Sequence, residues 1–462
     1  MKNLYLKYVL VGLMAISLFS CSDDSVDNVF DQAPANRLEQ ANSELLEALL
    51  AQTNGFKGVY FTKNDEFGGF TFFMKFNADG TVSMTSDFDA DTEIQSSTYE
   101  VRTGTASELV FTTHNHIQKV SDPDYPGLRG TGFKGTSVFQ LFSNENGTLT
   151  FRDVRNKNTG FFVLEPSGFS NFETESVASA EKSLAQRDNI IPGADDSIFQ
   201  VLKIENSNGE YNFNFNYNVF SQFASPRVEI YEGSIPTIRE FNFGVAFTED
   251  GLIISPALEF EGVVYENFIY DEDTNSYIST VNGTTATILF DSEPAFLSSD
   301  VNELGKPGHA TFGYRITWGA SPLTSVGFNT LLDDTDQRIQ ADFGSSSYFY
   351  QVYYFAQPDA DGIVEIRTYF VVGGALYYAS YLFEQKIENN RLYLEYLGYG
   401  NGNASYFANA SELIINFFAS ETGMYFYDHG SFSTDTSSYG NLSSSFTSAD
   451  QPNLRLYGLW FD

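Results

Sequence analysis

Turn-forming dipeptides recur along this 462-residue chain and limit its fold more than any other feature. Asn or Asp followed by Gly suits the tight turn of a β-hairpin, because these residues tolerate positive φ. Each of six such pairs is flanked by apolar or β-branched residues, which is typical of antiparallel strands. The sequence therefore predicts short strands joined by hairpins. The pairs are Asp79-Gly80, Asn146-Gly147, Asn208-Gly209, Asp250-Gly251, Asn282-Gly283 and Asp361-Gly362.

The segment Tyr211–Tyr217 has the clearest strand pattern. Its aromatic residues alternate strictly with three asparagines, so the rings share one face of a strand and the amides share the other. Pairs such as Tyr377-Tyr378 place rings on both faces, and one of those faces needs a second layer or a ligand. We therefore predict an all-β, multi-domain protein of antiparallel β-barrel or β-sandwich modules.

Two segments have a helical period instead. Residues 36–52 repeat apolar side chains near helical spacing and stop before Asn54-Gly55, which predicts a short N-terminal helix. Residues 173–187 contain no Gly or Pro and lie between β-rich regions, which predicts a helical inter-domain connector.

These elements predict a series of modules along the chain. The third β-region is either separate from the second domain or continuous with it. The predicted modules are the N-terminal helix with a first β-domain (35–167), the helical connector (168–195), a second β-domain (196–300) and a third β-region (301–462). A shared pattern of phenylalanines before Asp79-Gly80 and before Asp250-Gly251 suggests that one β-module was duplicated.

The first twenty residues have the layout of a secretory signal, with a short positive region and an apolar run too short to span a bilayer. Ser20 before Cys21, with Leu18 further upstream, resembles the lipobox of bacterial lipoproteins. That resemblance implies a signal peptide (1–20) and a tether (21–34) lipidated at Cys21, which would hold the protein on a membrane. The alternative is an ordinary signal peptide that happens to carry a cysteine.

Cysteine usage and charge narrow the classes of function. Cys21 is the only cysteine, so the rest of the chain has no disulfide, no cysteine nucleophile and no cysteine-ligated metal. The formal charge of −35 repels phosphate backbones, and we therefore expect no nucleic-acid partner.

The region between residues 54 and 123 contains a series of recognisable stretches: Asn54–Tyr60, Phe72–Asn77, Asp79–Val82, Met84–Phe88, Leu109–Phe111, His116 and Ser121–Pro123. Together they resemble a family of uncharacterised Bacteroidetes putative lipoproteins, a domain of unknown function. One departure is Phe133-Lys-Gly135, where a more acidic Gly-Asp pairing is expected. The resemblance implies an uptake-linked lipoprotein and supplies no activity and no catalytic residues.

Location follows from the same resemblance. The acidic Ser22-Asp23-Asp24 after the lipidated cysteine is similar to the signal that sends Bacteroidetes lipoproteins to the outer face of the outer membrane. We expect a protein anchored in the outer membrane through lipid on Cys21 and facing outside the cell, with the periplasmic face as the alternative. A TonB-linked uptake complex is the partner that the resemblance implies.

Two groups of residues have the chemistry of metal ligands. Asp87, Asp89, Asp91 and Glu93 space carboxylates at alternate positions, as a calcium loop does, but without the glycine that an EF-hand has at its sixth position. A solvated loop is the alternative interpretation.

The second group is a pair of histidines. His114 and His116 alternate on a predicted strand and would face the same way, and two imidazoles beside a carboxylate suit zinc. The alternative is two polar residues at a strand end. We expect no cofactor, with calcium and zinc as the candidate ions.

Enzyme signatures are sparse. Gly130-Thr-Gly132-Phe-Lys-Gly135 matches a dinucleotide fingerprint, but that motif needs a following helix, and a strand is predicted here. We therefore predict a non-catalytic surface lipoprotein that captures a nutrient, either a glycan or a peptide, beside an outer-membrane uptake system. A structural or partner-binding envelope protein would instead expose a large apolar patch. A glycan-directed hydrolase would place two carboxylates about 5 to 10 Å apart in a cleft.

Overall fold

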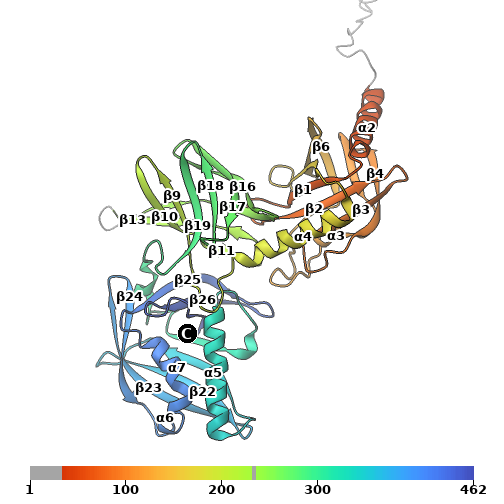
Figure 1. Ribbon diagram of the computed structural model, residues 1–462. Helices are drawn as coiled ribbons and strands as arrows, with labels where there is room; N and C mark the ends of the chain where they lie inside the picture. The colour runs from red at the N-terminus through yellow and green to blue at the C-terminus, as the bar shows by residue number, and fades with distance from the viewer. Residues whose placement is uncertain (1–33, 232–235, 462) are drawn as a thin grey trace, which may run out of the picture.

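The computed structural model describes residues 34–231 and 236–461. The predicted signal peptide, Cys21 and the tether up to residue 33 lie outside them. Three sheets follow one another along the described chain, and a long helix crosses between the first two (Figure 1). The predicted all-β architecture, with an N-terminal helix and a helical connector, is confirmed.

The first sheet is a closed antiparallel barrel in which the first strand pairs with both the second and the last. Buried aromatic residues fill its interior, and Leu45 and Leu49 of helix α2 (Pro34–Ala51) join this core. A four-residue helix, α3 (His116–Lys119), interrupts the strands. The strands are β1 (Phe56–Phe61), β2 (Gly69–Phe76), β3 (Thr81–Ser86), β4 (Gln95–Thr103), β5 (Ser107–Phe111), β6 (Val138–Glu145), β7 (Thr148–Asp153) and β8 (Phe161–Pro166).

Helix α4 (Phe172–Asn189) connects the first sheet to the second. Asn171 begins it, since its side chain accepts a hydrogen bond from the backbone N–H of Thr174. The helix packs against β2 and β3 of the first barrel and against β15 of the second sheet, where β2 and β15 also contact each other.

The second sheet is an open half-barrel of antiparallel strands. Its order along the sheet runs β11-β12-β15-β16-β17-β18-β19-β9-β10-β13-β14. The strands are β9 (Phe199–Asn206), β10 (Gly209–Asn214), β11 (Tyr217–Asn218), β12 (Phe223–Ala224), β13 (Arg227–Tyr231), β14 (Pro236–Glu240), β15 (Phe243–Thr248), β16 (Gly251–Phe260), β17 (Val263–Asp271), β18 (Ser276–Val281) and β19 (Thr284–Asp291).

The third sheet is again closed, because its first strand pairs with its last. Closure between β24 and β25 rests on one residue pair, Leu392 with Met424. Two short 3-10 turns, Ser299–Glu303 and Ile316–Trp318, flank its first strand. The strands are β20 (Thr311–Arg315), β21 (Tyr348–Phe355), β22 (Ile363–Val372), β23 (Ala375–Glu388), β24 (Arg391–Tyr399), β25 (Met424–Ser433), β26 (Ser438–Ser448) and β27 (Arg455–Phe461).

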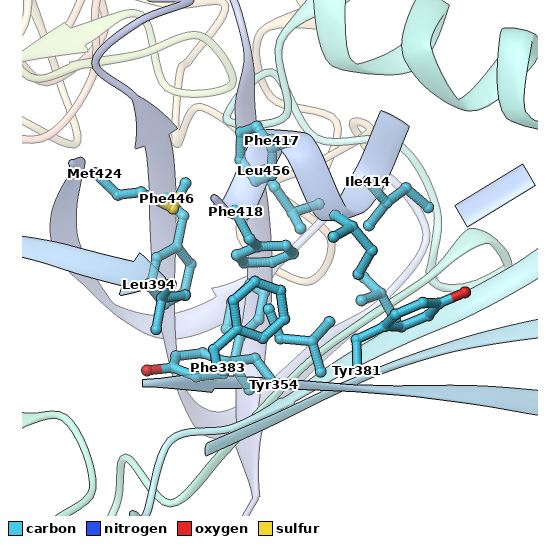
Figure 2. Packing of buried hydrophobic residues seen from close by; sticks show 14 of the residues in the cluster. Tyr354, Tyr381, Phe383, Leu394, Ile414, Phe417, Phe418, Met424, Phe446 and Leu456 are labelled. Carbon is cyan, nitrogen blue, oxygen red and sulfur yellow. The ribbon is translucent and has the colours of Figure 1, made fainter. Parts of the chain in front are cut away.

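Helices that the sequence interpretation missed pack on the third sheet: α5 (Val326–Phe343), α6 (Asn403–Tyr406) and α7 (Ala408–Phe418). Figure 2 shows Phe418 of α7 among Tyr354, Phe383 and Phe446 of the strands. The helix supplies the core where β24 and β25 separate. Its polar residues recur at helical spacing opposite a buried apolar face, so the signal of an amphipathic helix was present in the sequence.

The predicted hairpins are present at all six turn dipeptides, each between two paired strands. The strand predicted over Tyr211–Tyr217 is shorter than expected. Strand β10 ends at Asn214, and the left-handed φ of 48° at Asn216 bends the chain before β11. That bend helps to form the cavity described next.

Candidate functional site

A cavity of about 500 Å³ lies between the second and third sheets, with Gly127 and Leu128 of the first barrel at its edge. Cavities of this size accommodate small ligands. One wall is the outward face of β25, β26 and β27. The other is built from the start of β9, the end of β10, β13, the segment 216–220 that contains β11, and the segment 296–300 that leads into a 3-10 turn.

The third-sheet wall follows from strand alternation. Phe426, Phe446 and Leu456 point into the core, so their neighbours in sequence point outward. The strand register sets these neighbours in rows. Tyr427, Ser445 and Tyr457 form one row, and Thr447 lies directly opposite Arg455 in the next.

Hydrogen bonds join the two walls at one side of the cavity. The hydroxyl of Tyr427 donates to the carbonyl oxygen of Phe296 at 2.7 Å. The side chain of Asn214 accepts a hydrogen bond from the backbone N–H of Ala295 at 2.7 Å. Burial raises the pKa of Tyr427 above its ordinary value. A neutral tyrosine therefore anchors the 296–300 loop to the third sheet.

Basic groups are concentrated on the third-sheet wall. His429 is exposed to the cavity and its Nε2 lies 2.8 Å from Ser445 Oγ. Desolvation by the surrounding walls, with a smaller contribution from the positive charge of Arg455, lowers the pKa of His429 to about 3. The imidazole is thus neutral at physiological pH. Burial also lowers the pKa of Arg455 to about 10, which leaves it charged.

Three carboxylates, Glu229, Asp300 and Asp428, line the same cavity. Asp428 accepts hydrogen bonds from Ser444 Oγ at 2.5 Å and lies 3.1 Å from His309 Nε2. Burial raises the pKa of Asp428, although Ser444 and His309 lower it. Asp300 accepts the backbone N–H of Asp428 at 3.2 Å, so these two groups lie close together.

Three residues that line the cavity carry buried polar atoms without a hydrogen-bond partner among the described residues: Thr447 Oγ1, Arg227 Nε and Tyr217 OH. Leaving such an atom unpaired costs about 1–3 kcal/mol, so each points to a missing partner such as a ligand or water. The cavity therefore combines aromatic rings with unused hydrogen-bonding groups.

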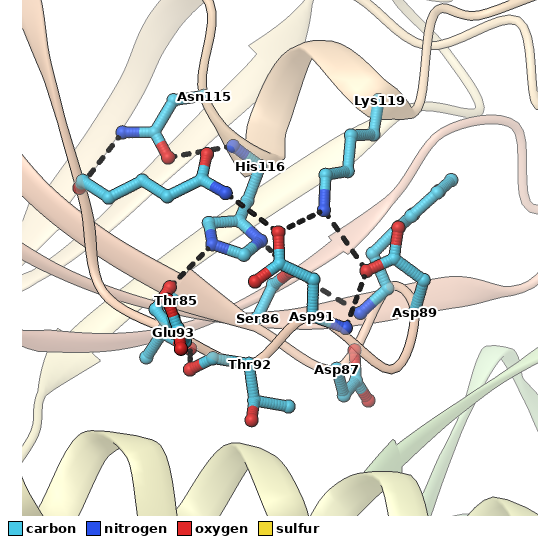
Figure 3. A network of polar contacts seen from close by, with 12 residues as sticks. Thr85, Ser86, Asp87, Asp89, Asp91, Thr92, Glu93, Asn115, His116 and Lys119 are labelled. Carbon is cyan, nitrogen blue, oxygen red and sulfur yellow. Dashed lines mark hydrogen bonds and ion pairs between the residues drawn. The ribbon is translucent and has the colours of Figure 1, made fainter.

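The four predicted calcium ligands do not converge. Lys119 Nζ lies 3.0 Å from Asp89 and 3.2 Å from Asp91 (Figure 3). Asp87 is buried, with Arg187 of α4 at 3.7 Å. Glu93 takes part in this network through its backbone oxygen, which lies 2.9 Å from His116 Nε2.

The two histidines are also separated. His116 does not continue a strand; it begins α3, capped by the side chain of Asn115, and is fully buried with Nδ1 3.2 Å from Ser86 Oγ. His114 is exposed. Within residues 34–231 and 236–461, no group of three His, Cys, Asp or Glu side chains is arranged to hold a metal. Calcium or zinc binding therefore stays a prediction without a supporting geometry here.

The cavity residues were missed because they are far apart in sequence, from residue 127 to residue 457. One signal was present. Polar residues alternate with core residues in Ser445-Phe-Thr447 and Arg455-Leu-Tyr457, which marks an outward face. None of the helices in the described part of the chain has the length and apolarity needed to cross a bilayer.

A family model described as a domain of unknown function, DUF4302, matches residues 26–272, which include the first barrel and most of the second sheet. No curated protein matches the chain.

Proposed function

The chain belongs to the DUF4302 family, and from this premise we propose that it is a non-catalytic protein that captures a ligand between its second and third sheets. The single observation that carries the proposal is the polar and aromatic cavity of about 500 Å³ with its unpartnered buried atoms. Aromatic faces stack on sugar rings or apolar side chains, and fixed polar groups give orientation. A glycan or a peptide is the expected ligand.

Array binding with the full chain in detergent tests this proposal. We expect specific binding by the wild-type chain and its loss in Ser431→Trp, since Ser431 lines the cavity and an indole there would obstruct it. Ser346→Trp is the matched control, because Ser346 is exposed outside the cavity. A folded wild-type chain that binds no glycan and no peptide would overturn the proposal. Parallel arrays with calcium and with chelator test the ion predictions.

The location proposed for this activity is the outer membrane, with lipid on Cys21 and a position beside a TonB-linked uptake system. Support comes from the sequence resemblance to Bacteroidetes lipoproteins. Labelled fatty acid should enter the wild-type chain and not Cys21→Ser. Digestion by protease added to whole cells would distinguish the outer face from the periplasmic one.

A second candidate, binding of a protein partner in the envelope, is favoured by exposed apolar side chains on the third sheet. They include Leu376, Tyr396, Leu397 and Tyr399 of β23 and β24, and Tyr406 of the adjoining α6 is 72% exposed. Exposed apolar side chains of this size occur at interaction surfaces. A protein that copurifies with the wild-type chain and is lost from Tyr396→Ser/Tyr399→Ser would support this candidate.

The third candidate, glycan hydrolysis, is favoured by the carboxylates on the cavity. Burial holds the pKa of Asp428 above its ordinary value, as a general acid requires, and Asp300 lies beside it. Both oxygens of Asp428, however, already lie 3.1 Å from His309 Nε2. Sugar products released by the wild-type chain and not by Asp300→Asn would replace the capture proposal.

A further inference from the structure

Arg455 on the cavity wall is a cation without an ion-pair partner in the part of the chain that the structure describes. Acidic residues outnumber Lys and Arg by 60 to 25 in this chain, so carboxylate partners are abundant. Arg455 nevertheless donates from Nε to the carbonyl of Leu323 at 2.8 Å and from Nη2 to that of Pro322 at 3.1 Å. Among the described residues, no carboxylate forms an ion pair with its guanidinium, and burial lowers its pKa to about 10.

A hydroxyl group beside this cation lacks a partner. Thr447 lies directly opposite Arg455 across the β26–β27 pair, and both residues line the cavity. Thr447 is 1% exposed, and its Oγ1 forms no hydrogen bond among the described residues. A guanidinium and a free hydroxyl on one wall match the oxygens of a carboxylate.

The other charged groups of the cavity do not supply the same recognition. Arg227 is compensated, because its Nη2 donates to Glu229 Oε1 at 2.6 Å. His429 is neutral at physiological pH, since its environment lowers its pKa to about 3. Arg455 is therefore the positively charged residue of the third-sheet wall that has no carboxylate partner among the described residues.

The form of the wall distinguishes a sugar from a peptide. Extended peptides gain most of their affinity by pairing their backbone with an exposed strand edge. Here β26 is paired on both sides, with β25 and with β27, and presents its face to the cavity. The edge strand β11 also lines the cavity, but its two residues are too few to pair with an extended peptide. Side-chain amides and the rings of Tyr427 and Tyr457 line the space instead, and these suit hydroxyl groups and pyranose rings.

We propose that the cavity binds an acidic sugar, and that the guanidinium of Arg455 and the hydroxyl of Thr447 hold its carboxylate. This inference rests on the proposed capture function and names its ligand class. The carboxylate belongs to a uronic acid residue within an oligosaccharide.

Calorimetry on the full chain in detergent tests the inference with galacturonate oligosaccharides and the same oligosaccharides after carboxyl reduction. We expect the acidic form to bind at least about 10-fold tighter, the effect of one charge-assisted hydrogen bond. Arg455→Gln should remove this preference. Thr447→Val keeps the side-chain shape and should weaken binding of the acidic form about 5-fold without lowering the melting temperature.

The outcomes separate the two proposals. Equal binding of acidic and reduced sugars would overturn the carboxylate site and leave the capture function standing. Preference for peptides with a free over an amidated C-terminus, in place of either sugar, would overturn the sugar assignment. Absence of binding to every probe would overturn both proposals. If Arg455→Gln does not fold, unchanged affinity of Thr447→Val for the acidic sugar contradicts the inference by itself.

Discussion

The two junctions between sheets are built in opposite ways. Where the first barrel meets the second sheet, glycine backbones touch: the N–H of Gly68 donates to the carbonyl of Ser221 at 2.8 Å, and a Cβ on Gly244 would lie 2.3 Å from the carbonyl oxygen of Phe67. Thr71 Oγ1 also donates to the carbonyl of Phe247 at 2.6 Å. Where the second sheet meets the third, polar and aromatic faces enclose a cavity instead.

The difference assigns separate roles to the junctions. Close backbone contact leaves no room for sliding, so the first junction fixes the second sheet relative to the first barrel. The loop that frames the cavity ends at this junction, because Phe220 precedes Ser221 and packs over Gly127. The tight junction between the first barrel and the second sheet therefore positions the second-sheet wall of the cavity.

The largest effect is expected from adding a methyl group to the tight junction. Gly244→Ala sets a Cβ against the backbone at Phe67 and Gly68, which cannot yield as a flexible side chain would. We expect a loss of about 3 kcal/mol in unfolding free energy, the upper part of the range for overpacking. Urea denaturation followed by circular dichroism measures it.

Gly440→Ala is the matched control, because a Cβ on Gly440 meets nothing within 4 Å. Its unfolding free energy should stay within about 0.5 kcal/mol of wild type. Equal midpoints for both variants would show that the first junction is looser than the backbone contacts imply.

The next effect concerns the carboxylate buried at the tight junction. Burial raises the pKa of Asp87 to about 6, although Arg187 and the backbone N–H of Thr71 act to lower it. Between about pH 4 and pH 6 the folded chain therefore retains a proton that the unfolded chain has lost. The contribution of Asp87 to stability is most favourable below pH 4 and falls by about 2–3 kcal/mol as the pH rises through 6.

Asp87→Asn should remove this dependence, because the amide does not titrate. The difference in unfolding free energy between wild type and the variant, measured at pH 4 and pH 7, should change by that amount. Asp89→Asn is the control, since Asp89 is a surface residue paired with Lys119. Its difference from wild type should vary by less than about 0.5 kcal/mol. A constant difference for Asp87→Asn would contradict a buried, titrating carboxyl.

The sequence predicted the strands better than the site for physical reasons. Hairpin turns are local, and a pair such as Asn282-Gly283, with φ of 51° and 80°, specifies its own conformation. Helix α4 was equally visible from its uninterrupted helical stretch. Helix α5 was missed although Ser325 caps it and Phe328, Leu332 and Ile339 recur at helical spacing, so that signal was available.

The site depends on contacts that no local pattern encodes. Carboxylates spaced like a calcium loop meet cations of the chain itself, because Lys119 bridges two of them and Arg187 lies beside the buried Asp87. Arg455 and Thr447 become neighbours through strand pairing, and the facing wall comes from another sheet. The alternation of polar and apolar residues along a strand identifies which side chains face outward, but it does not show which other part of the chain covers them.

The smallest effect tests whether the open junction is built for a ligand and not for stability. Thr447→Val replaces a buried, unpartnered hydroxyl by a methyl group of similar shape, so we expect the ligand-free chain to gain about 1 kcal/mol in unfolding free energy. Thr368→Val is the matched control, because Thr368 is equally buried but lies 2.8 Å from Ser411 Oγ. That variant should lose about 1 kcal/mol, since it leaves a buried hydroxyl without its partner. Opposite signs in thermal or urea unfolding would mark Thr447 as a residue kept at a cost to stability, as ligand-binding groups often are. Destabilisation by both variants would instead mean that an internal partner satisfies Thr447, and the open junction would then resemble the tight one.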